Sequence, residues 1–396
     1  MKTVALCIFA CSAIALRAAD SRVLDSMDAQ TFQVPKEKCT VEVVEGKDGK
    51  ALKFSFDKEC RNIAAISKIR GAADWDAAAG ISFWVKGDGS DHLGGMEFIW
   101  NEDYGIRYAF AFPISGTEWT KVLVPWSDFV PETSNAKALP LGKEGNAPSK
   151  LGTLWFGKWW YWRDYAAHSY TIDDIRLETK LVVPVAEPVK HTTPSLQRVL
   201  AKLQAGKPVT IVTMGDSLTD YAHWANKPIN WPTLLKEKLH AKYKSEVTIV
   251  NPAMGGTELR QNMILIPRWQ KEAPEPDLVT IWFGGNDWNS GMRGAMFDAT
   301  MQDAVERVRA ATKDKADVLI MSTCPSVENW DTMAELAEGC RHAAGAKYAA
   351  IGDIYKVFHE IGKADPASLY CKDKTHLGAA GHELVAKTIA DLIENK

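Results

Sequence analysis

The sequence predicts two domains of different class: an all-β jelly roll or sandwich, followed by an α/β domain with a parallel sheet. Short alternating or apolar runs separated by Gly- and Asp-rich turns fill residues 20–180. Residues 181–195 contain three prolines and little periodicity, which is typical of a semi-rigid linker. In residues 196–396 apolar strand-like runs alternate with helical patterns, which indicates a parallel sheet covered on both faces.

Residues 1–19 have the features of a secretory signal peptide. Met1-Lys2 is followed by the apolar run Val4–Leu16 and by Ala18-Ala19, and this run is too short to span a bilayer as a helix. We therefore expect a secreted or periplasmic protein. A net charge of −3 with mixed signs gives no basic footprint for nucleic acid. No later segment is apolar enough to predict a membrane span, and the sequence predicts no oligomeric state.

Five cysteines follow the predicted signal peptide, so intramolecular pairing leaves at least one free thiol. Cys39 and Cys60 lie near two neighbouring predicted strands, and they form either a disulfide or two buried free thiols. No Cys/His spacing resembles a zinc site, and we expect neither a metal nor a cofactor.

Six runs predict strands in the first domain, namely residues 41–44, 52–56, 81–85, 96–100, 119–124 and 170–177. Trp84 and Trp126 are embedded in strand patterns and are expected in the core. Nine of the 15 tryptophans lie in this part of the chain, and several cluster near residue 160. Aromatic faces stack on sugar C–H surfaces, so an exposed cluster would suit glycan binding, whereas strand tryptophans more often belong to a core.

The first domain resembles the galactose-binding-like jelly-roll domains of carbohydrate-binding modules. The resemblance rests on residues 80–87 (GISFWVKG), 119–129 (WTKVLVPWSDF) and 172–177 (IDDIRL). It implies a glycan-binding role, for which the candidate residues are Trp159, Trp160 and Trp162.

The second domain carries strand-like runs at residues 209–214, 247–250, 278–283, 318–321 and 348–351. Helical patterns cover residues 232–243, 257–269, 299–311, 331–344 and 379–393. Ligand sites of open α/β sheets lie at the carboxyl ends of the strands. Four polar blocks interrupt the pattern at such places, namely residues 215–218 (GDSL), 251–257 (NPAMGGT), 284–287 (GGND) and 373–376 (DKTH).

With these four blocks, residues 196–396 resemble the SGNH hydrolase superfamily, also called GDSL esterases. The resemblance implies a flavodoxin-like three-layer α/β/α fold with five parallel strands. It also implies that Ser217 is the nucleophile, that His376 is the general base and acid, and that Asp373 orients His376. A serine needs such a base near neutral pH, and a carboxylate fixes the tautomer of the imidazole.

The same resemblance implies an oxyanion hole made by the N–H of Ser217, the N–H of a glycine and the side-chain amide of Asn286. Counting from Asn251 aligns the glycine with Gly256, and the doubled glycine leaves Gly255 as an alternative. Asp216, next to the serine, is interpreted as a group that stabilises the turn rather than as the acid of the triad.

These features favour a secreted esterase that removes O-acetyl groups from a polysaccharide. The alternatives are an SGNH esterase or lipase acting on lipid or aryl esters, and a glycan-binding protein with an inactive hydrolase domain. Tryptophans near the strand-end loops could line a sugar subsite or could serve ordinary packing; they are Trp224, Trp231, Trp288 and Trp330. His223 and Asp220 are candidates for contacts with sugar hydroxyls.

Overall fold

The computed structural model describes residues 21–34, 38–60, 65–158, 166–181 and 190–395. The predicted signal peptide and the candidate glycan-binding residues Trp159, Trp160 and Trp162 lie outside the described residues. So does most of the predicted linker, at residues 182–189.

Residues 21–181, called the β region here, contain two antiparallel sheets. The first has the order β2-β3-β11-β5-β8, with β1 also paired to β11. Its strands are β1 (Ser21–Asp25), β2 (Cys39–Glu45), β3 (Lys50–Phe56), β5 (Gly80–Gly87), β8 (Thr120–Pro125) and β11 (His168–Glu178). The second has the order β4-β10-β6-β7-β9. Its strands are β4 (Ala65–Ile66), β6 (Leu93–Trp100), β7 (Asp103–Pro113), β9 (Val130–Pro131) and β10 (Leu151–Lys158).

The predicted all-β class is therefore confirmed for this region, while its jelly-roll topology stays a prediction. Short 3-10 helices connect the strands at Ala73–Ala77, Trp126–Asp128 and Pro148–Lys150. Cys39 and Cys60 are both buried, and no disulfide joins them in the structure. Burial, with a contribution from the neighbouring Cys60, raises the pKa of Cys39 to about 12.

One hydrophobic core fills the space between the two sheets. Phe54 and Phe156 come from different sheets and lie with ring centroids 5.1 Å apart. Trp126 is buried as predicted and stacks on Trp75 at 5.6 Å. The prediction for Trp84 was wrong: its ring is only partly buried and lies under the Lys47 ammonium, 4.1 Å from the centroid. Because side chains alternate between the two faces of a strand and the neighbours of Trp84 point inward, Trp84 points outward.

The rest of the fold is a five-stranded parallel sheet, as the sequence predicted. Its order is β13-β12-β14-β15-β16, the order of flavodoxin-like folds. The strands are β12 (Val209–Gly215), β13 (Val247–Val250), β14 (Leu278–Trp282), β15 (Asp317–Met321) and β16 (Ala350–Gly352). The sequence placed the last strand two residues too early, because Tyr348 has φ 51° and closes the preceding helix.

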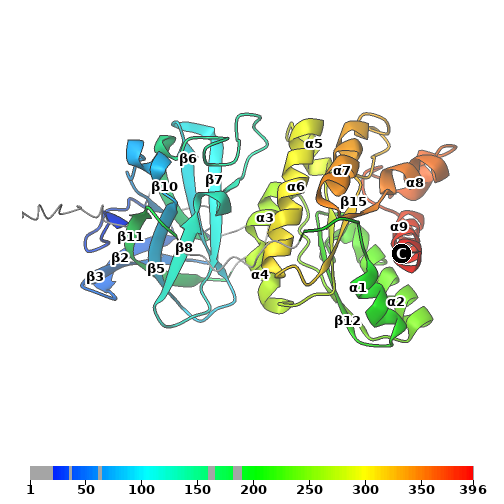
Figure 1. The fold of residues 1–396 in the computed structure, drawn as a ribbon, viewed down its shortest axis with the longest axis horizontal. Helices are drawn as coiled ribbons and strands as arrows, with labels where there is room; N and C mark the ends of the chain where they lie inside the picture. Colours follow the sequence, from blue (N-terminus) through cyan, green and yellow to red (C-terminus); the bar gives the residue numbers. More distant parts are fainter. Residues whose placement is uncertain (1–20, 35–37, 61–64, 159–165, 182–189, 396) are drawn as a thin grey trace, which may run out of the picture.

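Helices cover both faces of this sheet (Figure 1). One face carries α1 (Gln197–Gln204), α2 (Trp231–Tyr243), α8 (Ile354–Ile361) and α9 (Ala379–Glu394). The other carries α3 (Leu259–Ile264), α4 (Ile266–Glu272), α6 (Gly294–Ala311) and α7 (Ala334–Lys347). The short helix α5 (Gly285–Asn289) follows β14, and 3-10 helices lie at Trp224–Asn226 and Pro366–Leu369. Side chains alternate between the two faces along β12. Ile211 packs in the core beneath α1, α2, α8 and α9, and Val212 packs in the core beneath α3, α4, α6 and α7.

The single helix predicted over residues 257–269 is in fact two, α3 and α4, which meet at Leu265. Pro267 lies in the first turn of α4, where its missing N–H costs nothing. Inside a continuous helix the same proline would remove a hydrogen bond and clash with the preceding turn.

The β region packs against the α3, α4 and α6 layer (Figure 1). Leu93, Ala109, Ala111 and Val130 of the β region belong to the same buried cluster as Met263 of α3 and Ile266 of α4. Polar contacts cross the interface as well: the Arg307 guanidinium donates to the carbonyl of Ser127 at 2.6 Å. The two parts of the chain therefore share a core.

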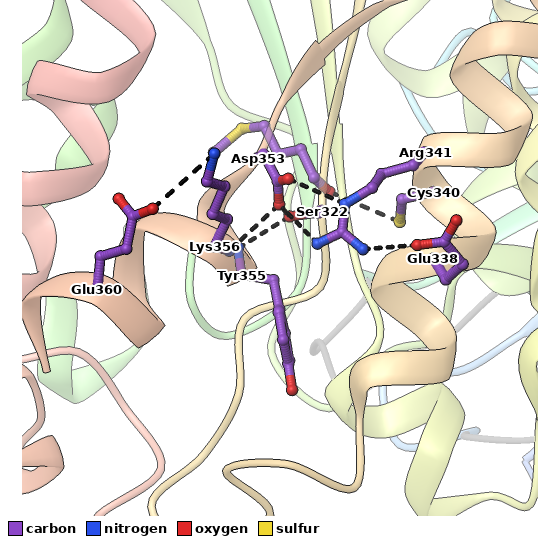
Figure 2. A network of polar contacts seen from close by, with 9 residues as sticks. Ser322, Glu338, Cys340, Arg341, Asp353, Tyr355, Lys356 and Glu360 are labelled. Atoms are coloured by element: carbon purple, nitrogen blue, oxygen red, sulfur yellow. Dashed lines mark hydrogen bonds and ion pairs between the residues drawn. The ribbon is translucent and has the colours of Figure 1, made fainter. Parts of the chain in front are cut away.

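A polar network fixes the carboxyl ends of β15 and β16 (Figure 2). Asp353 accepts hydrogen bonds from Arg341 of α7 at 2.9 and 3.1 Å, from the Ser322 hydroxyl at 3.0 Å and from the N–H of Lys356 at 3.2 Å. Burial would raise the pKa of Asp353, but the bonds from Arg341 and its other donors outweigh it and lower that pKa. The carboxylate caps α8 and ties it to α7. Among the described residues, no helix has the length and apolar character needed to cross a membrane.

Candidate active site

The turn after β12 presents Ser217 at the carboxyl edge of the parallel sheet. A Cβ on Gly215 would come within 2.4 Å of the Thr219 hydroxyl, so the end of the strand has no room for a side chain. Asp216 then organises the turn, because its carboxylate accepts from the N–H of Leu218 at 2.9 Å. The predicted turn-stabilising role of Asp216 is confirmed.

A chain of hydrogen bonds joins Ser217, His376 and Asp373. The Ser217 hydroxyl and the His376 Nε2 are 2.9 Å apart, and the His376 Nδ1 lies 2.6 Å from the Asp373 carboxylate. The same carboxylate accepts from the N–H of His376 at 3.1 Å and of Thr375 at 3.2 Å, so one short loop fixes both side chains. The three predicted residues thus have the geometry that acyl transfer by a serine requires.

Hydrogen bonds within this loop favour the ionised form of Asp373, which orients the His376 imidazole. Burial would raise the pKa of Asp373, but the hydrogen bonds from the His376 ring and from the N–H groups of His376 and Thr375 outweigh it and lower that pKa. An ionised Asp373 fixes the proton of His376 on Nδ1 and leaves Nε2 free to accept the hydroxyl proton of Ser217.

The three predicted oxyanion donors differ in the hydrogen bonds that they already make. Neither the N–H of Ser217 nor that of Gly256 has a hydrogen-bond partner among the residues that the structure describes. The Asn286 amide donates to the carbonyl of Thr257 at 3.0 Å and makes a longer contact of 3.4 Å with Asp216. A hydrogen bond of 3.4 Å is weak, so an oxyanion could replace it.

The two glycines of the second block, Gly255 and Gly256, differ in whether their N–H groups already donate a hydrogen bond. Gly255 donates to the Asp220 carboxylate at 2.9 Å, and a Cβ at this position would lie 3.5 Å from the Cβ of Ser217. Gly256 has φ 78°, which favours glycine. Since the Gly255 N–H is already bonded, Gly256 has the N–H that is free for a ligand.

Buried carboxyl groups flank Asn286. Burial raises the pKa of Asp216 to about 6 and that of Asp287 to about 8. Asp287 accepts from the N–H of Leu259 at 3.0 Å, which links α5 to the start of α3.

Two aromatic side chains cover His376. The His223 ring is stacked on the His376 ring with centroids 4.2 Å apart, and the Trp224 ring lies 5.8 Å away at a steep angle. Trp224 is 56% exposed, so its free face borders the site. Burial, followed by the charge of His376, lowers the pKa of His223.

The other candidate substrate residues have structural contacts. The Asp220 carboxylate accepts from the N–H groups of Ala222 and Gly255, and it orders the loop around the serine. The Trp288 ring is covered by the Arg293 guanidinium at 3.8 Å. Trp330 packs on His359 and Tyr370. Trp231, the first residue of α2, is fully buried and cannot line a subsite, which corrects the sequence-based suggestion.

Some features near the site had no signal in the sequence. The stacking of His223 on His376 joins positions that are far apart in the chain, and the burial of Asp287 depends on the α3 and α5 segments meeting. No group of three or more His, Cys, Asp or Glu side chains that could hold a metal ion occurs within the described parts of the chain.

Residues 213–384 match the family model described as GDSL-like Lipase/Acylhydrolase. This part of the chain is a GDSL-like hydrolase domain. All four polar blocks lie within the match. The hydrolase domain therefore belongs to a family of esterase and lipase type, and its five-stranded parallel sheet agrees with that assignment.

A curated relative of the hydrolase domain is thioesterase 1/protease 1/lysophospholipase L1 of Escherichia coli strain K12. It is 27% identical over 121 residues, which are 31% of this chain and 55% of the relative. The same protein of Escherichia coli O6:H1 matches equally. The chain thus spans about half the length of the curated relatives that it matches.

Two solved structures are similar to the hydrolase domain. One is the lipase/acylhydrolase from Enterococcus faecalis, 22% identical with a TM-score of 0.40, covering 47% of this chain and 96% of that one. The other is an acetylxylan esterase from Geobacillus stearothermophilus, also 22% identical with a TM-score of 0.40, covering 48% and 96%.

Proposed function

We propose that this protein is a secreted or periplasmic serine esterase that removes O-acetyl groups from a polysaccharide or oligosaccharide. The observation that carries the proposal is the hydrogen-bonded chain from Asp373 through His376 to Ser217, with spacings of 2.6 and 2.9 Å. A serine alcohol in contact with an oriented imidazole is the arrangement for nucleophilic attack on an ester carbonyl.

In the proposed reaction, Ser217 attacks the acetyl carbonyl while the Nε2 of His376 takes its proton. The tetrahedral intermediate then collapses, and His376 gives the proton to the departing sugar oxygen, which leaves an acetyl-serine. Water, deprotonated by His376, attacks this ester and releases acetate. Asp373 stabilises the imidazolium in both steps without accepting its proton.

The oxyanion formed in each step is proposed to bind three donors: the N–H of Ser217, the N–H of Gly256 and the amide of Asn286. Two of these donors have no partner among the described residues, and the third has one weak contact that can be exchanged. Donors held in place before the reaction need no reorganisation when charge develops.

An exposed aromatic ring at the border of the site supports a carbohydrate substrate. Trp224 presents an aromatic face with 56% exposure next to the His376 ring, and sugar C–H surfaces stack on such faces. The β region, attached directly to the hydrolase layer, is the proposed glycan-binding part. Its candidate residues Trp159, Trp160 and Trp162 are tested by substitution to alanine in glycan-binding measurements.

The experiment that tests the proposal measures acetate release from acetylated xylan, pectin and mannan by the full-length protein, with Ser217→Ala as control. A series of synthetic esters of increasing acyl length is measured beside it. The proposal expects acetate release that depends on Ser217 and a preference for acetyl over long acyl chains. A strong preference for long chains would refute the sugar-ester assignment.

A second candidate function is hydrolysis of lysophospholipids or thioesters. The observation that favours it is the similarity to the Escherichia coli protein, whose name describes both activities. Release of fatty acid from a lysophospholipid at a higher kcat/KM than acetate from any of the polysaccharides would select it. An inactive hydrolase domain that only binds glycans is disfavoured by the intact serine–histidine–aspartate geometry.

A further inference from the structure

The Glu258 carboxylate joins the hydrolase domain to the β region. One of its oxygens accepts the hydroxyl hydrogen of Ser134, from the segment after β9, and the other accepts that of Ser290, at the end of α5. Ser134 is 9% exposed and Glu258 is half-buried, so their contact is partly shielded from water. Glu258 closes the loop formed by residues 255–258, called the oxyanion loop here, which contains Gly256.

A second contact crosses the interface at the neighbouring position. The Arg260 guanidinium donates to the carbonyl of Thr133 and, at 3.3 Å, to the Thr300 hydroxyl of α6. Arg260 is 5% exposed, and a buried guanidinium that lost these acceptors would be costly. Thr133 and Ser134 of the β region thus hold both the end of the oxyanion loop and the start of α3.

From Glu258 the contacts lead directly to the proposed oxyanion donors. The adjacent residue, Thr257, is fully buried and its carbonyl accepts from the Asn286 amide at 3.0 Å. Leu259, on the other side, is bonded to Asp287 at 3.0 Å. A movement of Glu258 would therefore move the acceptor that orients Asn286 and the N–H of Gly256 two residues earlier.

We infer that Ser134 and Glu258 are positioning residues, through which the β region holds the oxyanion loop and Asn286 in their reactive geometry. The inference rests on the proposed function and deepens it: the β region is part of the catalytic apparatus as well as a candidate glycan-binding part. A small displacement of a donor to the oxyanion raises the activation free energy, so the loss of a hydroxyl far from the reacting atoms lowers the rate.

The test uses full-length variants and a short synthetic ester such as p-nitrophenyl acetate. Ser134→Ala should lower kcat roughly 10- to 100-fold, with KM within about twofold of the parent value, because only the donors to the oxyanion are displaced. Ser134→Thr keeps the hydroxyl and should restore most of the rate. In an Asn286→Ala background, Ser134→Ala should cause less further loss, because one of the two donors that Ser134 positions is already absent and only the Gly256 N–H remains to be displaced.

Asp91→Asn is the matched control. It removes the ion pair between Asp91 and Lys271, which also crosses the interface but lies on the surface away from the oxyanion loop, and it should leave kcat unchanged. Should Ser134→Ala fail to fold by circular dichroism, Glu258→Gln provides the same test, since it weakens the acceptor and keeps the side-chain volume.

A kcat for Ser134→Ala equal to that of the parent would overturn the inference, and so would an equal loss in Asp91→Asn. If Ser134→Ala lowered kcat by the same factor in the Asn286→Ala background as in the parent, Ser134 would not act through Asn286, and this result would also overturn the inference. These outcomes are separate from failure of the proposed function, in which Ser217→Ala would retain the parent activity.

Discussion

The imidazole of His223 lies face to face with that of His376, with ring centroids 4.2 Å apart and an angle of 28° between the planes. The stack shields one face of the proposed base and restrains the rotation of its ring. The low pKa of His223, caused by burial and by the charge of His376, favours a neutral ring beside an imidazolium.

His223→Ala should lower kcat for short esters roughly 3- to 10-fold, because the unsupported His376 ring samples unproductive orientations. His223→Phe preserves the stacked surface and should retain most of the activity. Steady-state kinetics of both variants check the prediction, and equal rates for the alanine and phenylalanine variants would contradict it.

Asn286→Ala should lower kcat about 100- to 1000-fold, which corresponds to about 3–4 kcal/mol of transition-state stabilisation for one oxyanion donor. KM should change little, since the donor acts mainly on the tetrahedral intermediate. The comparison requires kcat and KM on one ester under identical conditions. A variant that loses affinity but keeps its kcat would exclude Asn286 from the oxyanion hole.

Asp287 should make the protein less stable as the pH rises. Its pKa is about 8 in the folded chain, against 3.8 for an ordinary aspartate, so the folded chain holds the extra proton between these values. The stabilisation is complete below pH 3.8 and is lost progressively as the pH approaches about 8.

Asp287→Asn is expected to abolish this dependence, because asparagine does not titrate and its oxygen can still accept from Leu259. One proton corresponds to at most about 1.4 kcal/mol for each pH unit. Urea unfolding of both proteins at several pH values tests this, and parallel pH profiles for the two would refute the assignment.

His382 should make the protein less stable as the pH falls. Burial lowers its pKa from 6.5 to about 4, so the folded chain keeps the ring neutral while the unfolded chain takes up a proton. Its stabilisation is complete above pH 6.5 and is lost as the pH falls toward 4.

His382→Gln should be less stable than the parent at neutral pH, because the Nδ1 of His382 accepts from the N–H of Trp231 at 3.3 Å. Its deficit should shrink as the pH falls from 6.5 toward 4. Thermal unfolding at intervals across this range measures the difference, and a deficit that stayed constant would contradict the account.

The sequence predicted the parts of the molecule that depend on local pattern. Runs such as residues 209–214 carry the period and β-branched residues of buried parallel strands, and β12 lies there. Three of the polar blocks follow strands directly, so their convergence at one edge of the sheet follows from parallel topology. The fourth, residues 373–376, comes after α8 and a 3-10 helix, just before α9. At that edge the structure brings His376 within hydrogen-bonding distance of both Ser217 and Asp373.

Features that depend on contacts between distant segments could not be predicted. Trp84 lies in a strand pattern, but which face of the strand points outward is decided by the sheet that packs against it. The bond between Ser134 and Glu258 joins residues 124 positions apart, and neither lies in a recognisable motif. The break between α3 and α4 did have a local signal, Pro267, which the helical periodicity around it outweighed.

In the proposed mechanism the Ser217 alcohol, activated by His376, attacks the ester. The most direct measurement is the rate of p-nitrophenyl acetate hydrolysis by purified Ser217→Ala and by the parent, with circular dichroism to establish that both are folded. The account predicts that the variant falls to the rate of the uncatalysed background or close to it. Turnover by folded Ser217→Ala at the parent rate would contradict it.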